Sequence, residues 1–214
     1  MSPPGAHSGG RAGGGSAWSA LAGVFALGLV VYCAPSMLGH AGALAEERVA
    51  PAPLARPGSW WLVRRAGGMD ERLELKEVRS DGTLVTEAAG RRTLWTPEWN
   101  VLESPGPAAG ATIAYRPHVR TFSFPLQPGK RWGGQVDWQA GAESGSWTSR
   151  GEAKGWESIT VPAGRFDALR VEYEIDGQPW FACWYAVEVQ YPIKCDYPAQ
   201  RERSFELLDY RLAR

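Results

Sequence analysis

The sequence predicts a single all-β domain, an antiparallel β-sandwich or partly open β-barrel of about nine or ten strands. Short stretches in which apolar and polar residues alternate follow one another from Gly58 onward, and turn residues separate them. No stretch after Gly58 carries apolar residues at the i, i+3, i+4, i+7 spacing of an amphipathic helix. Together these observations favour a fold built from strands alone.

The individual strands differ in how clearly they can be recognised. Residues 167–177 give the clearest strand, because apolar and charged residues alternate strictly along it. Residues 72–89 predict a hairpin in which Asp81-Gly82 supplies the positive φ angles of a type I′ turn. Gly164 is expected to take a positive φ in a turn, after which Phe166 closes one end of the core. The other candidates are 59–65, 91–100, 112–126, 132–141, 145–161, the two arms of 179–198, and 203–212.

The first 45 residues differ from the rest, since they contain no Asp or Glu and a single Arg. An uncharged, mostly apolar stretch covers residues 17–34, and Ala43 and Ala45 form an A-x-A pattern before Glu46. This order is typical of a secretory signal peptide over residues 1–45. The alternative is a membrane anchor, in which the helix of residues 17–34 holds the protein at the inner membrane.

Export therefore predicts a periplasmic or otherwise extracytoplasmic domain at residues 58–214. Residues 46–57 are rich in Pro and Ala and are expected to be a linker. Cys183 and Cys195 lie at equal distances from Val189, and an oxidising compartment allows a disulfide to persist. If the turn of a hairpin centres on Val189, the two cysteines are directly opposed, and we expect a disulfide. The alternative is two free buried thiols.

Composition and motifs argue against several functions. Lys and Arg number 23 and Asp and Glu also 23, so no basic surface for nucleic acid is expected. His118 is the one histidine after residue 45, and it follows a proline, which suggests a loop. We therefore expect no metal site, no cofactor and no catalytic residue, and an enzyme is the less favoured interpretation. A hydrolase that uses two carboxylates stays open as an alternative, because sequence alone does not exclude it.

Tryptophan is the most unusual component, with eleven residues, ten of which follow residue 45. Trp60 and Trp61 are adjacent, so one of them must point away from the main core if they lie in a strand. In the hairpin of residues 179–198, the face that carries the cysteines is expected to pack inward. Trp180 and Trp184 then face outward, partly covered by the stem of Lys194, and form the candidate ligand-binding surface. The alternative is a strand buried on both faces, with Lys194 and Asp196 beyond the rim of the core.

Three motifs also follow one another in the second half of the chain. They are PLQPGKRW (125–132), VPAGRFDALRVE (161–172) and WYAVEVQYPIKC (184–195). In this order they resemble a group of exported bacterial β-rich domains of unknown function. The resemblance implies a β-rich fold and a place in the cell envelope, and it implies no activity and no site residues.

The sequence therefore predicts a non-catalytic, exported cell-envelope β domain that binds an apolar or glycan ligand through an aromatic surface. One alternative is an interaction subunit whose exposed strand face docks onto another envelope protein. The other is the carboxylate-based hydrolase.

Overall fold

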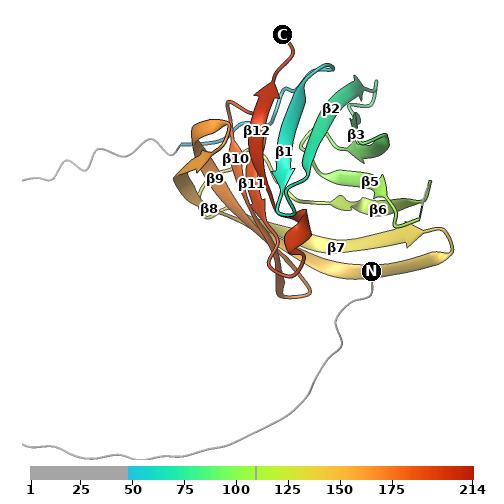
Figure 1. Ribbon diagram of the computed structural model, residues 1–214. Coiled ribbons are helices and arrows are strands. Elements are labelled where there is room, and N and C mark those ends of the chain that lie inside the picture. Colours follow the sequence, from blue (N-terminus) through green and yellow to red (C-terminus); the bar gives the residue numbers. More distant parts are fainter. Residues whose placement is uncertain (1–47, 109) are drawn as a thin grey trace, which may run out of the picture. The chain divides into compact units, whose positions relative to one another are not determined.

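The protein forms a closed antiparallel barrel of 12 strands, in which each strand pairs with its neighbours in the chain and β1 also pairs with β12 (Figure 1). The computed structural model describes residues 48–108 and 110–214. The strands are β1 Trp60–Arg65, β2 Asp70–Val78, β3 Leu84–Ala88, β4 Arg91–Trp95, β5 Val101–Pro105, β6 Thr112–Val119, β7 Arg131–Ala140, β8 Glu143–Val161, β9 Gly164–Ile175, β10 Gln178–Ala186, β11 Tyr191–Asp196 and β12 Phe205–Arg211, with a short 3-10 helix at Arg201–Arg203.

The antiparallel all-β prediction is confirmed. Of the two expected architectures the structure is the barrel and not the sandwich, but the barrel is closed and has 12 strands where about nine or ten were expected. β5 was missed, because its sequence runs into a segment rich in Pro and Gly that is typical of a loop. Residues 120–126 were expected to be strand, but β6 ends at Val119 and the following residues form an irregular segment. Pairing of β1 with β12, from Trp60 opposite Arg211 to Arg65 opposite Phe205, closes the barrel. Closure gives every described strand a partner on both sides, although β11 and β12 pair over only two residues each.

Two Asp-Gly turns take different forms. Asp176 and Gly177 both have positive φ, of 50° and 75°, and they make the tight turn between β9 and β10. Between β2 and β3 only Gly82 has a positive φ, of 85°, and the loop runs from Arg79 to Thr83. The type I′ turn predicted at Asp81-Gly82 is therefore wrong in detail. The hairpin itself is correct, and so is the positive φ of 138° at Gly164.

One end of the barrel is filled by aromatic side chains, and we call it the filled end. Trp61 from β1 and Trp99 from the β4–β5 connection meet at 5.3 Å, ring centroid to ring centroid. Their indole N–H groups donate to the carbonyls of Val189 and Gln190 in the β10–β11 turn, both at 2.9 Å. Trp60, by contrast, points outward and lies under Arg72, as expected for one of two adjacent tryptophans. The polar atoms of this packed region are thus satisfied.

The irregular β6–β7 connection completes the filled end. Phe122, Phe124 and Leu126 are buried, and both phenylalanine rings contact Tyr185 on β10. The side chain of Asn100 accepts a hydrogen bond from the backbone N–H of Phe122 at 2.8 Å. The connection is irregular because its backbone turns into the barrel end instead of continuing along the sheet.

The described part of the expected linker, residues 48–57, lies against the barrel. Ala50 is fully buried and exchanges two backbone hydrogen bonds with Leu126, at 2.8 and 2.9 Å. The Arg48 guanidinium lies 4.0 Å from the ring centroid of Trp156 and forms an ion pair with Asp167 at 3.1 Å. Composition suggested a linker, but backbone pairing to the β6–β7 connection gives these residues a fixed place.

The proposed signal peptide or anchor, residues 1–45, lies outside the described residues. Over residues 48–108 and 110–214, the structure contains no helix that is long and apolar enough to cross a membrane.

Candidate functional site

The face that carries the two cysteines is the inner face of the β10–β11 hairpin, as predicted. Cys183 and Cys195 are opposed in the register and form a disulfide, and both are buried. Trp184 lies on the opposite face, between Arg170 on β9 and Lys194 on β11. The outward direction of Trp184 is therefore also correct.

Trp184 does not offer an open ring to a ligand, however. Its exposed fraction is 8%, because charged neighbours cover it. The indole N–H donates to Glu157 at 2.7 Å, and the Arg170 guanidinium and the Lys194 ammonium lie 5.5 and 5.7 Å from the ring centroid. Trp180 is at a bulge and is partly covered, with Arg203 at 5.9 Å. The expected aromatic surface is thus a covered one, since cation–π contacts and a hydrogen bond occupy the Trp184 ring.

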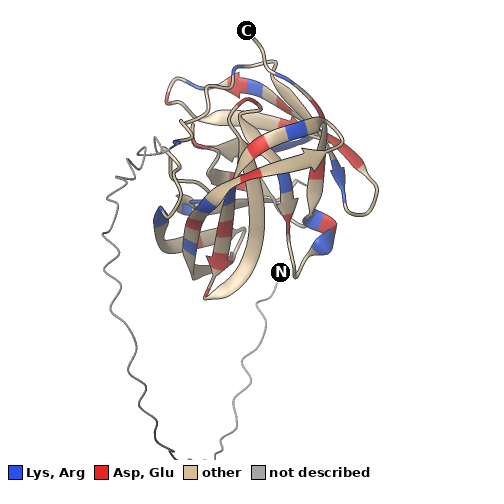
Figure 2. Cartoon of the chain, turned by 90° about the vertical axis from the view of Figure 1, so that its left-hand side faces the viewer, with Lys and Arg blue, Asp and Glu red and all other residues tan. Residues whose placement is uncertain are grey.

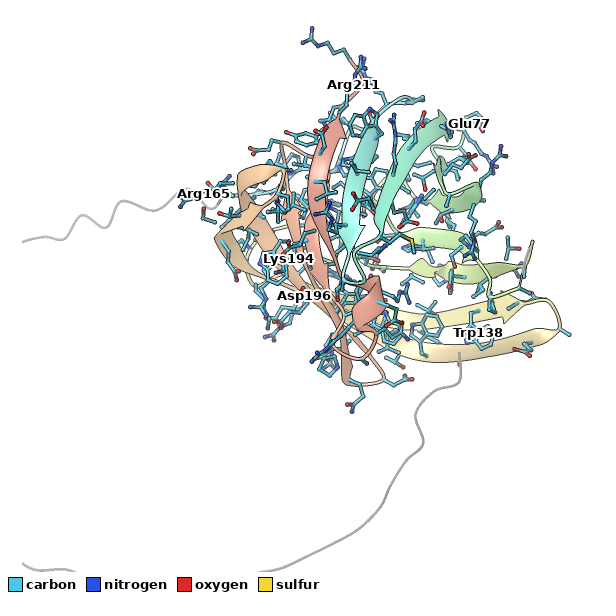
Figure 3. All side chains as sticks on the ribbon, viewed as in Figure 1. Glu77, Trp138, Arg165, Lys194, Asp196 and Arg211 are labelled. Atoms are coloured by element: carbon cyan, nitrogen blue, oxygen red, sulfur yellow. A yellow bond between two sulfur atoms is a disulfide. The ribbon has the colours of Figure 1, made fainter. Side chains whose placement is uncertain are left out.

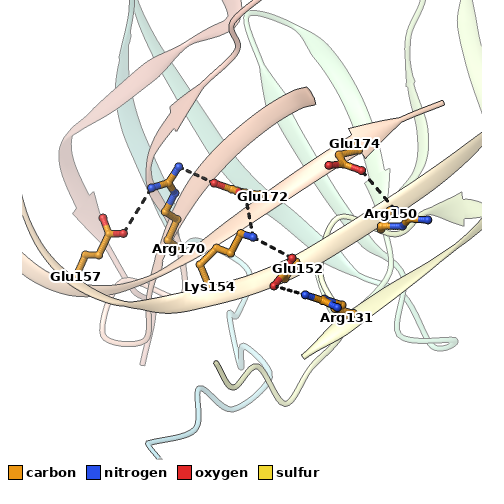
Figure 4. Close-up of polar contacts among 8 residues, drawn as sticks. All are labelled: Arg131, Arg150, Glu152, Lys154, Glu157, Arg170, Glu172 and Glu174. Atoms are coloured by element: carbon orange, nitrogen blue, oxygen red, sulfur yellow. Dashed lines mark hydrogen bonds and ion pairs between the residues drawn. The ribbon is translucent and has the colours of Figure 1, made fainter. Parts of the chain in front are cut away.

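Two of the charged residues at Trp184, Glu157 and Arg170, belong to a network that crosses the outer face of β7 to β9 (Figure 4). Lys154 bridges Glu152 at 2.9 Å and Glu172 at 3.3 Å. Arg170 pairs in turn with Glu172 at 2.6 Å and Glu157 at 3.8 Å. Figure 2 shows Lys and Arg interspersed with Asp and Glu along the strands. Exposed pairs of this kind contribute little to stability and leave no strong potential of one sign.

The network also bears on the hydrolase alternative. Hydrogen bonds from Lys154 and then Arg131 hold the pKa of the Glu152 carboxyl below its usual range. A general acid needs a raised pKa, so Glu152 is unsuited to that role. Glu172 is bonded to Lys154 and Arg170, which is typical of a solvated face.

His118 lies within β6, and the loop position suggested for it is wrong. Burial, and then the charge of Arg120, lower its pKa below the ordinary value. No group of three His, Cys, Asp or Glu side chains in the described residues is arranged to hold a metal ion.

A second aromatic surface lies on the inner face of the barrel, at the end opposite the filled one. Tyr115 on β6 is opposite Trp138 on β7, and Val136 on β7 is opposite Trp147 on β8. Val136 is 2% exposed and belongs to the interior, and cross-strand partners share a face, so all four side chains point inward. Tyr115, Trp138 and Trp147 define what we call the aromatic end; Trp138 is labelled near the tip of the β7–β8 hairpin in Figure 3.

The three aromatic residues of this end are only partly buried, although they face the inside of a closed barrel. The rings of Tyr115 and Trp147 meet edge to face at 5.9 Å, and the Tyr115 hydroxyl is 3.1 Å from the Ser104 hydroxyl. Partial exposure of inward-facing rings means that solvent reaches the interior at this end. At the filled end, Trp61 and Trp99 are 0% and 1% exposed, and the partly exposed Trp95, which packs against Trp99, donates its indole N–H to the Thr86 hydroxyl at 2.7 Å.

Glycine opposite tryptophan is repeated along the β7–β8 hairpin. Trp138 is opposite Gly145, and Trp132 is opposite Gly151. A Cβ on Gly145 would lie 2.7 Å from the Trp138 ring, and one on Gly151 would lie 2.3 Å from the Trp132 ring. Each ring therefore lies flat against the backbone of the neighbouring strand. At the aromatic end, one face of the Trp138 ring therefore lies against β8, and the other face points away from the sheet.

Two buried hydrogen-bond donors near this surface have no partner in the described residues. They are the indole N–H of Trp147 and the hydroxyl of Tyr173, which lies opposite Gly151 on the inner face. Burial raises the pKa of the Tyr173 hydroxyl, and the nearby Ser149 hydroxyl offsets this in part. Ser149 donates its own proton to the carbonyl of Gly134 at 3.1 Å, which leaves its oxygen able to accept, but its geometry to the Tyr173 hydroxyl is outside that of a normal hydrogen bond. An unmet buried donor costs about 1–3 kcal/mol, so each needs a physical explanation.

The sequence did contain a signal for this site. Trp138 and Trp147 were assigned to separate strands, and only the register of the β7–β8 hairpin shows that they share a face with Tyr115. In both Trp–Gly pairs, the two residues lie at equal distances from a turn at Gly141-Ala142, so that each pair of residue numbers sums to 283. This repeat would have indicated the register.

No family model matches this chain, and no curated protein matches it. Among solved structures it is similar to the hypothetical lipoprotein YmcC from Escherichia coli (K12), with 11% identity, a TM-score of 0.49, and coverage of 74% of this chain and 86% of that one. It is also similar to a "putative lipoprotein" from Parabacteroides distasonis, with 15% identity, a TM-score of 0.35, and coverage of 75% and 97%. Both similarities are too low to support a conclusion about function.

Proposed function

We propose that this protein is a non-catalytic, exported cell-envelope domain that binds a small uncharged ligand, apolar or glycan, at the aromatic end of its barrel. The observation that carries the proposal is the partial exposure of Tyr115, Trp138 and Trp147 on the inner face of a closed barrel. The ends of β-barrels are common places for small-molecule sites, which are mostly lined by aromatic side chains.

Export is supported by the sequence of residues 1–45 and by the disulfide between Cys183 and Cys195, which is typical of an oxidising compartment. Mass spectrometry of the protein purified from cells is expected to give an N-terminus near Glu46. A purified chain that still begins at Met1 would instead favour an inner-membrane anchor over residues 17–34.

The alternatives have less support. An interaction subunit would need a continuous exposed apolar area, whereas the exposed large apolar residues of the described chain are few and come from different segments: Val49, Leu54, Met69 and Val78. A hydrolase would need a carboxyl group with a raised pKa in a recess, and the Glu152 carboxyl has the opposite shift.

The binding proposal can be tested with two probes, N-phenyl-1-naphthylamine for an apolar ligand and maltohexaose for a glycan. We expect at least one of them to change the tryptophan fluorescence of the full exported chain in a saturable way. Trp138→Ala should weaken that binding about tenfold, whereas Trp184→Phe, on the outer face, should preserve it. If neither probe gave a saturable change, or if Trp184→Phe abolished binding while Trp138→Ala did not, binding at the aromatic end would be wrong.

A further inference from the structure

At the aromatic end, the inner face of β7 and β8 offers aromatic rings and hydrogen-bond donors and carries no charge, whereas the ion pair of Arg65 and Glu71 lies on β1 and β2, five or six strands away in the sheet order. The inward positions of β7 from Trp132 to Trp138 are Trp, Gly, Val and Trp, and those of β8 from Gly145 to Ala153 are Gly, Trp, Ser, Gly and Ala. A charged ligand would lose its hydration here without gaining an ionic partner. The inner face of β7 and β8 therefore favours an uncharged ligand.

The two unpartnered hydrogen-bond donors narrow the class of ligand further. The Trp147 indole contains a donor and no acceptor, and neither it nor the Tyr173 hydroxyl makes a hydrogen bond of normal geometry in the described residues. An alkyl chain would leave both donors unsatisfied, whereas a ligand that carries oxygen acceptors would satisfy them. The partly exposed rings of Tyr115 and Trp138 suit a ligand with flat apolar faces as well as those acceptors.

The distance between the two donors indicates how long a ligand must be to reach both of them. Tyr173 is opposite Gly151, which is four residues along β8 from Trp147, so the two backbone positions are about 13 Å apart. Trp147 lies toward the tip of the hairpin and is partly exposed, whereas Tyr173 lies deeper and is 1% exposed. A ligand that reaches both must extend along the inner face and must displace the side chains that cover the two donors in the free protein.

We propose that the aromatic end binds an uncharged oligosaccharide, with sugar rings stacked on Tyr115 and Trp138 and sugar oxygens accepting hydrogen bonds from Trp147 and Tyr173. This inference rests on the proposed function and adds the ligand class to it. Sugar rings have flat, weakly polar faces that can stack on aromatic rings. They also carry many oxygen atoms that can accept hydrogen bonds from the two donors.

The test compares three neutral hexasaccharides (maltohexaose, cellohexaose and hexa-N-acetylchitohexaose) with hexagalacturonate and with N-phenyl-1-naphthylamine, using calorimetry on the full exported chain. We expect at least one neutral sugar to bind, and the charged sugar to bind at least tenfold more weakly. Trp147→Phe and Tyr173→Phe each keep a ring and remove one donor, and each should weaken the sugar about tenfold. Their thermal unfolding midpoints should be unchanged or higher, because an unmet donor has been removed.

Trp156→Phe is the matched control, since it also removes an indole N–H, here one that donates to the Arg48 carbonyl at 3.0 Å, far from the aromatic end in the β8 sequence. It should leave sugar affinity unchanged. Binding of the naphthylamine probe without any neutral sugar would overturn the sugar assignment and leave the proposed function standing. No binding of any probe would overturn both. Full affinity for sugar in Trp147→Phe and Tyr173→Phe would overturn the role of the two donors.

Discussion

The two ends of the barrel use the same residue type in opposite ways. At the filled end, Trp61 and Trp99 are fully buried and each indole N–H donates to a backbone carbonyl. At the aromatic end, Trp138 and Trp147 face the same interior but are partly exposed, and the Trp147 N–H has no partner. Buried tryptophans whose N–H groups are bonded stabilise a fold strongly, whereas partly exposed ones stabilise it less and an unmet buried donor costs stability; a binding role accounts for both features at the aromatic end.

The largest expected contrast is in stability. Trp61→Ala should lower the free energy of unfolding by about 3–5 kcal/mol, because it leaves a large cavity and an unpaired Val189 carbonyl. Trp138→Ala should cost only about 1–2 kcal/mol, because less of its ring leaves contact with protein. Urea unfolding of the two variants measures both values. Equal losses would mean that the two ends are packed alike.

The disulfide should stabilise the filled end in particular. The loop that it closes contains Val189 and Gln190, whose carbonyls hold Trp61 and Trp99. Replacing both cysteines by alanine should cost about 3 kcal/mol, as expected for a short closed loop. Probe binding at the aromatic end should be retained by this variant at temperatures where it is folded. Loss of binding from a folded variant would show that the two ends are coupled.

The two Trp–Gly pairs of the β7–β8 hairpin give a matched comparison. Gly151→Ala should cost about 1–3 kcal/mol, because the new Cβ overlaps the Trp132 ring, which is buried and bonded to the Arg120 carbonyl. Gly145→Ala meets Trp138, which is partly exposed and can move outward, so its cost should stay below about 1 kcal/mol. A reversed order in thermal or urea unfolding would contradict the assignment of the ends.

The smallest expected effect concerns His118, close to the filled end on β6. Its pKa is lowered in the folded protein, so the unfolded chain binds the proton more readily. Stability should therefore be full above the ordinary histidine pKa of about 6.5 and should fall as the pH drops below it. His118→Asn should reduce the difference in urea midpoint between pH 7.5 and pH 5.5. An unchanged difference would assign the pH dependence to other groups.

Local signals in the sequence predicted much of the fold. Strict alternation located β9, the expected turn correctly gave Gly164 a positive φ, and symmetry about Val189 located the disulfide. Contacts between distant segments could not be read in this way. Barrel closure depends on β1 pairing with β12, and the filled end depends on a β6–β7 connection that turns inward.

The candidate site was predicted less well, for a related reason. Alternation in residues 179–198 correctly placed Trp184 on the outer face, but its cover comes from Glu157 and Arg170 on β8 and β9. Trp138 and Trp147 were visible as tryptophans, yet whether a residue is exposed inside a barrel depends on what fills that end. That property belongs to the packing of several connections and not to any one strand.

The most direct test of the account is fluorine NMR of the exported chain labelled with 5-fluorotryptophan, with resonances assigned by single Trp→Phe variants. A soluble paramagnetic gadolinium chelate should broaden the signals of Trp138 and Trp147 more than those of Trp61 and Trp99. The neutral sugar that binds best should then shift the Trp138 and Trp147 signals and protect them from broadening, with the Trp61 and Trp99 signals unchanged. Equal broadening at both ends, or a shift confined to Trp61 and Trp99, would contradict the central claim that one end is structural and the other binds ligand.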